Sequence, residues 1–213
     1  WKAKKLNSIT LPSISGGTVS GLMSSINWFF TDSHEDFAIF QIVVKNDSKD
    51  GTYYPQYINR ITLDSNGEYA LCYQARTETL LINDTPTETS LPEGYGVAPF
   101  LYVHRVLDFI FSEFGYTITE NPFKTDKELS SLVILNNAAD CCVTGILNYA
   151  DLMPDCTIED FLNALYVRFG LVYNVSSDTK LAQNFSHCAG GVFSDYRGHP
   201  RRCQQYSQSQ LAV

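Results

Sequence analysis

The chain of 213 residues is long enough for one domain or two small ones, and 44% apolar with 18% charged residues is typical of a globular protein. Its formal net charge of -8 would repel a phosphate backbone, so we do not expect a nucleic-acid partner. The longest apolar runs, residues 37–44 and 132–135, are far shorter than the roughly 20 residues of a membrane-spanning helix, so we expect no membrane span.

The region from residue 1 to residue 94 is predicted to be rich in β-structure. Residues 13–25 are rich in Ser and Gly, which favours a loop or a loosely held strand over a helix and indicates an N-terminal arm. Residues 37–44 form a run of aromatic and β-branched residues, which predicts a strand.

A hairpin is the strongest local prediction in this region. Residues 61–63 and 68–76 flank Asn66 and Gly67, and the Asn-Gly pair supplies the positive φ angles of a tight primed turn. A further short strand is predicted at residues 79–82.

Residues 95–180 are predicted to form a module of helices and strands. The Pro and Gly residues of 92–99 make that stretch resemble a linker. Apolar residues recur at helical spacing from Phe100 to Phe114, so we expect a helix that ends at Gly115, followed by a strand at 116–119.

The same order of elements occurs again later in this module. A capping-box pattern at 125–128 predicts a brief helix before a strand at 132–135. A second amphipathic helix is predicted from Thr157 to Phe169, with Gly170 as its end and a strand at 171–175. Two copies of helix, glycine and strand indicate one αβ module, since a solenoid needs three or more repeats.

Residues 181–213 lose this periodicity. They carry one acidic residue and three arginines and end in a segment rich in Gln and Ser. We therefore predict an irregular or disordered tail.

Two histidines were considered as functional residues. His34, Glu35 and Asp36 place a base beside two carboxylates, but sequence neighbours rarely converge on one substrate atom, so a solvated turn is the preferred interpretation. His104 falls near the apolar face of the first helix, which favours a partly buried packing residue over a pH-sensitive contact.

The cysteines are interpreted as free, small, buried thiols in a reducing compartment, because their density and spacing do not match a disulfide framework. They are Cys72, Cys141, Cys142, Cys156, Cys188 and Cys203. Cys141, Cys142 and Cys156 carry no signature of a nucleophile. His187, Cys188, His199 and Cys203 are ligand types that zinc accepts, but their spacing is not that of a zinc finger.

Acidic residues gather at the start of the second helix, where carboxylates stabilise the helix dipole. They are Asp151, Asp155, Glu159 and Asp160. Calcium binding is the alternative, but the regular alternation of an EF-hand loop is missing. Gly94 and Gly96 lack the third glycine of a nucleotide-binding loop and indicate a turn. We assign no catalytic, cofactor-binding or metal-binding residue and no cofactor, and we expect a protein that is not an enzyme.

Four segments of the second half share a recognisable pattern: Phe100–Tyr116, Asn121–Phe123, Leu132–Asn136 and Asp151–Gly170. This pattern resembles that of tail-associated structural proteins, of the baseplate or hub type, from phages and prophages of gut Bacteroidetes. The resemblance covers roughly residues 95–180, under half of the chain. It implies a virion component, assembled in the bacterial cytoplasm, that contacts other virion subunits or copies of itself and has no catalytic residues. It also implies a strand after Lys180, which the tail is not expected to supply.

The sequence thus predicts an α+β protein with a β-rich region at 1–94, a helix-strand module with two amphipathic helices at 95–180 and a tail at 181–213. Two other functions stay open. One is a carbohydrate- or receptor-binding module of a gut bacterium or phage, in which Trp28 or Tyr53 and Tyr54 stack on a sugar. The other is a hydrolase with a site assembled across the fold, which requires a cleft where His meets a carboxylate or Cys.

Overall fold

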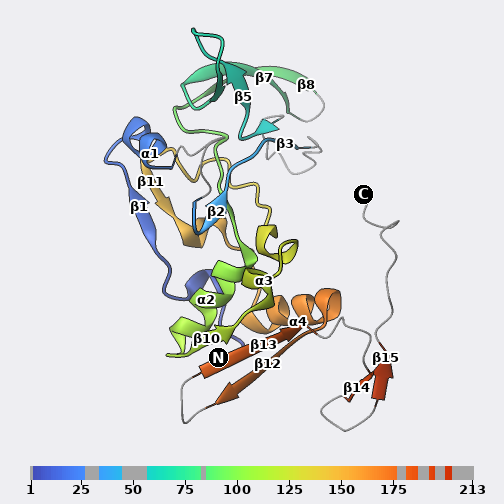
Figure 1. Cartoon of the computed structure of the whole chain (residues 1–213). Helices are drawn as coiled ribbons and strands as arrows, with labels where there is room; N and C mark the ends of the chain where they lie inside the picture. Colours follow the sequence, from blue (N-terminus) through green and yellow to red (C-terminus); the bar gives the residue numbers. More distant parts are fainter. Residues whose placement is uncertain are drawn as a thin grey trace.

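The computed structural model describes residues 2–26, 34–44, 57–82, 85–176, 181–186, 192–194 and 200–202. Short helices alternate with small, mostly antiparallel sheets, which confirms the predicted α+β class (Figure 1). The β-hairpins of the first half lie at one end of the molecule, and the two long helices lie toward the other end (Figure 1). Among the described residues, no helix is both long and apolar enough to cross a bilayer.

The N-terminal part is more regular than its Ser and Gly content suggests. A 3-10 helix, η1 (Leu6–Ser8), and strand β1 (Ser13–Ser15) precede helix α1 (Val19–Ile26). The prediction of a loop or loose strand through residue 25 is therefore wrong for α1. Val19, Leu22, Met23 and Ile26 are spaced at i, i+3, i+4 and i+7, and all four are buried on one face.

The predicted strand at residues 37–44 is split into β2 (Phe37–Ala38) and β3 (Ile42–Val43). The two parts have different partners, because β2 pairs with β9 (Phe100–Leu101) and β3 pairs with β4 (Tyr57–Ile58). The break at residues 39–41 therefore coincides with the change of partner strand.

The predicted hairpin is confirmed, with a different turn. Strands β5 (Ile61–Leu63) and β6 (Tyr69–Leu71) are antiparallel, but β6 is much shorter than the strand predicted at 68–76, because residues 72–75 are not in a strand. Gly67 has a positive φ of 79°, but Asn66 is not among the described residues with positive φ, so the turn is not the primed type that we predicted. The Gly67 amide donates to the Asp64 carbonyl, and the Asp64 carboxylate accepts from the Asn66 and Glu68 amides. This Asp side chain favours a longer loop closed by one glycine.

A second hairpin follows. Strand β7 (Arg76–Ile82) confirms the strand predicted at 79–82 and begins three residues earlier, and it pairs along its whole length with β8 (Thr85–Leu91). Strand β8 was not predicted, because its Thr, Glu and Pro residues give no apolar alternation.

The segment 92–99 does not run over the surface as a linker would. Val97 and Ala98 are fully buried, and the Asn59 side chain holds this segment to β4 by accepting from the Ala98 amide and donating to the Ala98 carbonyl. Asn59 itself has a positive φ of 55°, a conformation that Asn adopts more readily than most residues. The Gly and Pro residues serve buried turns here: Gly94 has φ 82°, and a Cβ there would lie 2.9 Å from the Cys142 carbonyl oxygen.

The two predicted amphipathic helices are confirmed as α2 (Val103–Glu113) and α4 (Ile158–Phe169). The first begins later than the predicted start at Phe100, because Phe100 and Leu101 form strand β9. Gly115 ends the first with φ 74°, and Gly170 ends the second with φ 66°. Thr157 and Asp160 form a reciprocal capping box at the start of α4. The helices lead into strands β10 (Thr117–Glu120) and β12 (Leu171–Ser176), as the repeated pattern indicated.

The capping box predicted at residues 125–128 is wrong. Thr125 is the last residue of helix α3 (Pro122–Thr125), which Asn121 caps by accepting from the Phe123 amide. Asp126 then accepts from the Glu128 and Leu129 amides before the 3-10 helix η2 (Leu129–Ser131). Residues 132–135 are extended beside β9, with a single bridge between Val133 and Tyr102 in place of the predicted strand.

The irregular tail was predicted to start too early. Residues Leu181–Ser186 form β13, which lies between β10 and β12 in a three-stranded sheet, parallel to β10 and antiparallel to β12. Ala182 is fully buried in it. A strand therefore follows Lys180, where an irregular tail was predicted. Short strands β14 (Val192–Ser194) and β15 (Pro200–Arg202) pair farther along.

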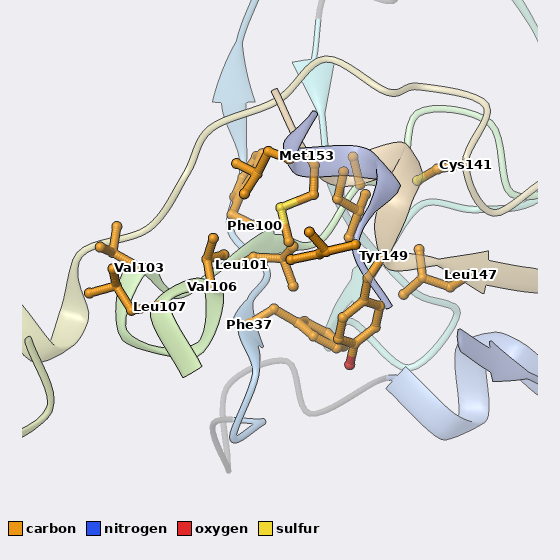
Figure 2. Packing of buried hydrophobic residues seen from close by; sticks show 14 of the residues in the cluster. Phe37, Phe100, Leu101, Val103, Val106, Leu107, Cys141, Leu147, Tyr149 and Met153 are labelled. Carbon is orange, nitrogen blue, oxygen red and sulfur yellow. The ribbon is translucent and has the colours of Figure 1, made fainter. Parts of the chain in front are cut away.

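One hydrophobic cluster extends from Leu6 to Ala182. Figure 2 shows part of it, where Phe37, Phe100, Leu101 and Val106 pack near Tyr149 and Met153. Tyr149 begins the 3-10 helix η3 (Tyr149–Leu152), and Met153 follows that helix. Strand β11 (Ile146–Asn148), which precedes η3, pairs with β1 from the other end of the chain. Segments from both halves of the sequence thus bury their apolar side chains together.

Candidate functional site

A buried polar cluster lies where β2, α2 and η3 meet. It consists of Asp36, Arg105 and Tyr149, and we call it the Asp36 cluster. Asp36 is only 7% exposed, and its two carboxylate oxygens have different donors: Arg105 Nε lies 2.5 Å from Oδ1, and the Tyr149 hydroxyl lies 2.9 Å from Oδ2. The Tyr149 ring packs against Phe37, as Figure 2 shows.

The electrostatics of the Asp36 cluster are those of a satisfied ion pair. Arg105 also donates to Asp108 at 3.2 Å, and its guanidinium carbon lies 5.4 Å from the centre of the Phe109 ring. Burial raises the pKa of Tyr149, and its hydrogen bond to the Asp36 carboxylate raises it further. The tyrosine therefore stays protonated and acts as a donor, and both carboxylate oxygens are already engaged. The arrangement stabilises a junction of three elements and leaves no general base.

The solvated turn predicted for His34, Glu35 and Asp36 is wrong at Asp36. The aspartate is buried, and His34 is half-buried, with its ring stacked on Phe37 at 4.2 Å between centroids. His34 Nδ1 accepts from the Asp36 amide at 3.1 Å. The sequence could not reveal this, because Arg105 and Tyr149 lie 69 and 113 residues from Asp36.

His104 is partly buried, as predicted for a packing residue. Its ring stacks on Tyr102 with 5.3 Å between centroids and 12° between planes. Its Nδ1 atom is buried and has no hydrogen-bond partner among the described residues. Burial lowers the pKa of His104, so the neutral imidazole is the form that the fold accommodates.

The described cysteines are free, as predicted. Cys141 and Cys142 are buried with their sulfur atoms 3.8 Å apart, whereas Cys72 and Cys156 are half-buried. Cys141 donates to the Val97 carbonyl, and the hydrogen bond with Cys142 together with burial raises its pKa. A raised pKa keeps the thiol protonated, which is the opposite of what a nucleophile needs.

The acidic cluster before and within α4 binds the N-terminal segment. Asp155 pairs with Lys5 at 2.7 Å and Glu159 pairs with Lys2 at 3.1 Å, while Asp160 closes the capping box. Glu113, at the end of α2, accepts from Lys4 and from the Thr10 amide. We call residues 2–10 the N-terminal strap, because their backbone also bonds to residues 156–159.

The structure brings together no metal-binding group in the part of the chain that it describes, where no three His, Cys, Asp or Glu side chains could hold one ion. The zinc ligand types considered above, at His187, Cys188, His199 and Cys203, lie outside the described residues. Gly94 and Gly96, with φ angles of 82° and 87°, form a turn as predicted.

Apolar side chains that remain in solvent are concentrated on strands. Leu63 and Tyr69 lie opposite each other in the β5–β6 hairpin and are 62% and 69% exposed. Val172 and Val175 of β12 are 40% and 44% exposed. Strand β12 is also an edge of its sheet, since β13 is its one partner among the described strands. We call residues 171–176 the β12 edge.

Comparison with known proteins does not assign the chain to a family. No family model, curated protein or solved structure matches the chain. Function must therefore be inferred from the described surfaces and clusters themselves, and the phage-tail resemblance stays a prediction.

These two features had unequal signals in the sequence. The Asp36 cluster was missed, because Arg105 and Tyr149 lie 69 and 113 residues from Asp36 in the sequence. The β12 edge had a visible signal: residues 171–176 contain no charged residue, proline or glycine. The sequence does not say that this strand lies at an edge.

Proposed function

We propose that the chain is a non-catalytic structural component of a phage or prophage tail or baseplate that acts in the virion through subunit assembly. The observation that carries this proposal is the exposed apolar strand surface at the β12 edge and at the Leu63–Tyr69 pair. An unpaired strand edge with exposed apolar side chains is a template on which a strand of another chain can pair. The β12 edge also belongs to the module in which the resemblance to tail proteins lies.

The polar interior of the described region supports a structural role. Asp36, Arg105 and Tyr149 satisfy one another, and the Cys141 thiol is kept protonated. The acidic residues of α4 are engaged by Lys2, Lys5 and the capping box. These groups stabilise the fold and are not arranged around a shared substrate position.

The proposed location can be tested in the bacterium that encodes the sequence. Tail particles would be induced, purified and labelled with an antibody raised against the chain, then imaged by electron microscopy with gold detection. We expect label at one end of the tail, and tail peptides from this chain in mass spectrometry of the same fraction. Particles that form normally and contain none of the chain would overturn the proposal.

A carbohydrate- or receptor-binding module is the second candidate, and Tyr69 favours it. An aromatic ring that is 69% exposed on a hairpin offers a flat apolar face on which a sugar could stack. The residues considered for this role from the sequence, Trp28, Tyr53 and Tyr54, lie outside the described residues. Binding to a glycan array that is lost in Tyr69→Ala and retained in Leu63→Ala would favour this function, and an array without binding would count against it.

A further inference from the structure

We propose that the β12 edge pairs with the same strand of a second copy of the chain, forming an antiparallel continuation of the β10–β13–β12 sheet across a two-fold axis. The inference rests on the proposed assembly function and names one of its contact surfaces. Figure 1 shows β12 on the side of β13 that faces away from β10.

The first support is the backbone of β12. All six residues, Leu171–Ser176, pair with β13 in unbroken register on one side. On the other side, no described strand pairs with β12. An edge strand of this kind presents a row of peptide donors and acceptors that a further strand can satisfy.

The second support is the lack of protection at this edge. Edge strands of monomeric proteins are commonly blocked by charges, proline or bulges. Two other described edges have these features: β10 carries Glu120 and an irregular register beside it, and the β7–β8 hairpin carries Arg76, Glu88 and Pro86. The β12 edge has none of them and exposes two valines.

The choice of a second copy follows from charge and symmetry. The chain as a whole carries a charge of -8, but the β12 edge is uncharged, so two copies can approach there without placing like charges opposite each other. A two-fold axis normal to the sheet keeps the faces of the two sheets aligned. If the axis passes Tyr173, Val175 of one copy lies opposite Leu171 of the other, and an apolar row continues across the junction.

The experiment measures the solution mass of the full chain by light scattering over a wide range of concentrations. We expect a concentration-dependent dimer. Val175→Lys and Val172→Lys each place a charge on the edge, and each is expected to raise the dimer dissociation constant at least tenfold. The matched control is Val167→Lys on α4, whose valine is 80% exposed and lies off the strand, and it is expected to leave the constant unchanged.

Far-ultraviolet circular dichroism of each variant establishes that the fold is retained. Because two edge variants are made, the test still holds if one of them does not fold. A wild-type chain that stays monomeric overturns the inference. An oligomer that neither edge substitution weakens also overturns it. Neither result bears on whether the chain is found in tail particles, so a failure of the self-pairing can be told apart from a failure of the proposed function.

Discussion

Removing the Asp36 carboxylate should be among the most damaging single substitutions in the described core. Asp36→Ala deletes the acceptor of both Arg105 Nε and the Tyr149 hydroxyl. The side chains of Asp36 and Arg105 are 10% and 24% exposed, so water cannot fully replace the lost partner. Breaking a buried ion pair from one side costs about 3–5 kcal/mol, and since Arg105 keeps Asp108 we expect about 3 kcal/mol.

The neighbouring groups provide graded controls. Tyr149→Phe keeps the ring packed against Phe37 and removes one hydrogen bond to a charged acceptor, which should cost about 1.5–3 kcal/mol. Asp108→Ala removes only the i,i+3 contact with Arg105, which should cost about 0.5 kcal/mol. The expected order of destabilisation is therefore Asp36→Ala, then Tyr149→Phe, then Asp108→Ala.

Urea unfolding followed by circular dichroism measures the free energy of unfolding of each variant. With a urea dependence of about 1–3 kcal/mol per molar, a loss of 3 kcal/mol lowers the midpoint by about 1 M or more. If Asp36→Ala and Asp108→Ala differ by less than about 1 kcal/mol, the Asp36 cluster does not hold its three elements together and the reasoning fails.

Three further predictions concern other sites. Because burial lowers the pKa of His104 from 6.5, the folded protein binds fewer protons at this residue than the unfolded protein, so the free energy of unfolding should fall as pH drops below 6.5. In urea titrations, His104→Phe should reduce this dependence on pH, and an unchanged dependence would contradict the prediction. In Gly115→Ala the new Cβ meets nothing within 4 Å, so the variant should lose about 1–2 kcal/mol of stability because of its positive φ alone. In Gly145→Ala the Cβ would lie 2.7 Å from a backbone carbon of Thr18, so the melting temperature should fall considerably more; equal effects would refute the close approach of Gly145 to Thr18. The hydrogen bonds from Lys4 and Thr10 lower the pKa of Glu113 from 4.5 to about 2, so the stabilising contribution of Glu113 should be complete above pH 4.5 and be lost as pH falls toward 2. Glu113→Gln should make the free energy of unfolding depend less on pH in that window, and identical acid unfolding curves would exclude the contact of Glu113 with Lys4 and Thr10.

The elements that the sequence predicted well are those whose signals are local. Helices α2 and α4 each combine an apolar stripe with a glycine that adopts a positive φ, and both features are contained in about a dozen residues. The β5–β6 hairpin was located by Asn66 and Gly67, but its turn type depends on the Asp64 side chain, which competes for the same backbone amides. Local chemistry therefore placed the hairpin without determining its geometry.

The elements that were missed depend on distant partners or on composition that conceals a pattern. Helix α1 has the correct apolar spacing, but Ser and Gly between those positions suggested a loop. Strand β13 was assigned to a disordered tail, since its polar residues become ordered only by pairing with β10 and β12. The Asp36 cluster joins residues up to 113 positions apart, and nothing near Asp36 in the sequence points to Tyr149.

The N-terminal strap imposes an order on folding. Lys2 meets Glu159 across 157 residues, and the strap residues Leu6 and Ile9 are buried only when residues near 156 are in place. At a synthesis rate of about 5–20 residues per second, the strap emerges from the ribosome roughly 8–30 s before its acceptor. During that interval its apolar side chains have no native site. This contact joins residues 2–10 to helix α4 (Ile158–Phe169), which is synthesised much later, and such long-range closure is slow in refolding as well as in synthesis.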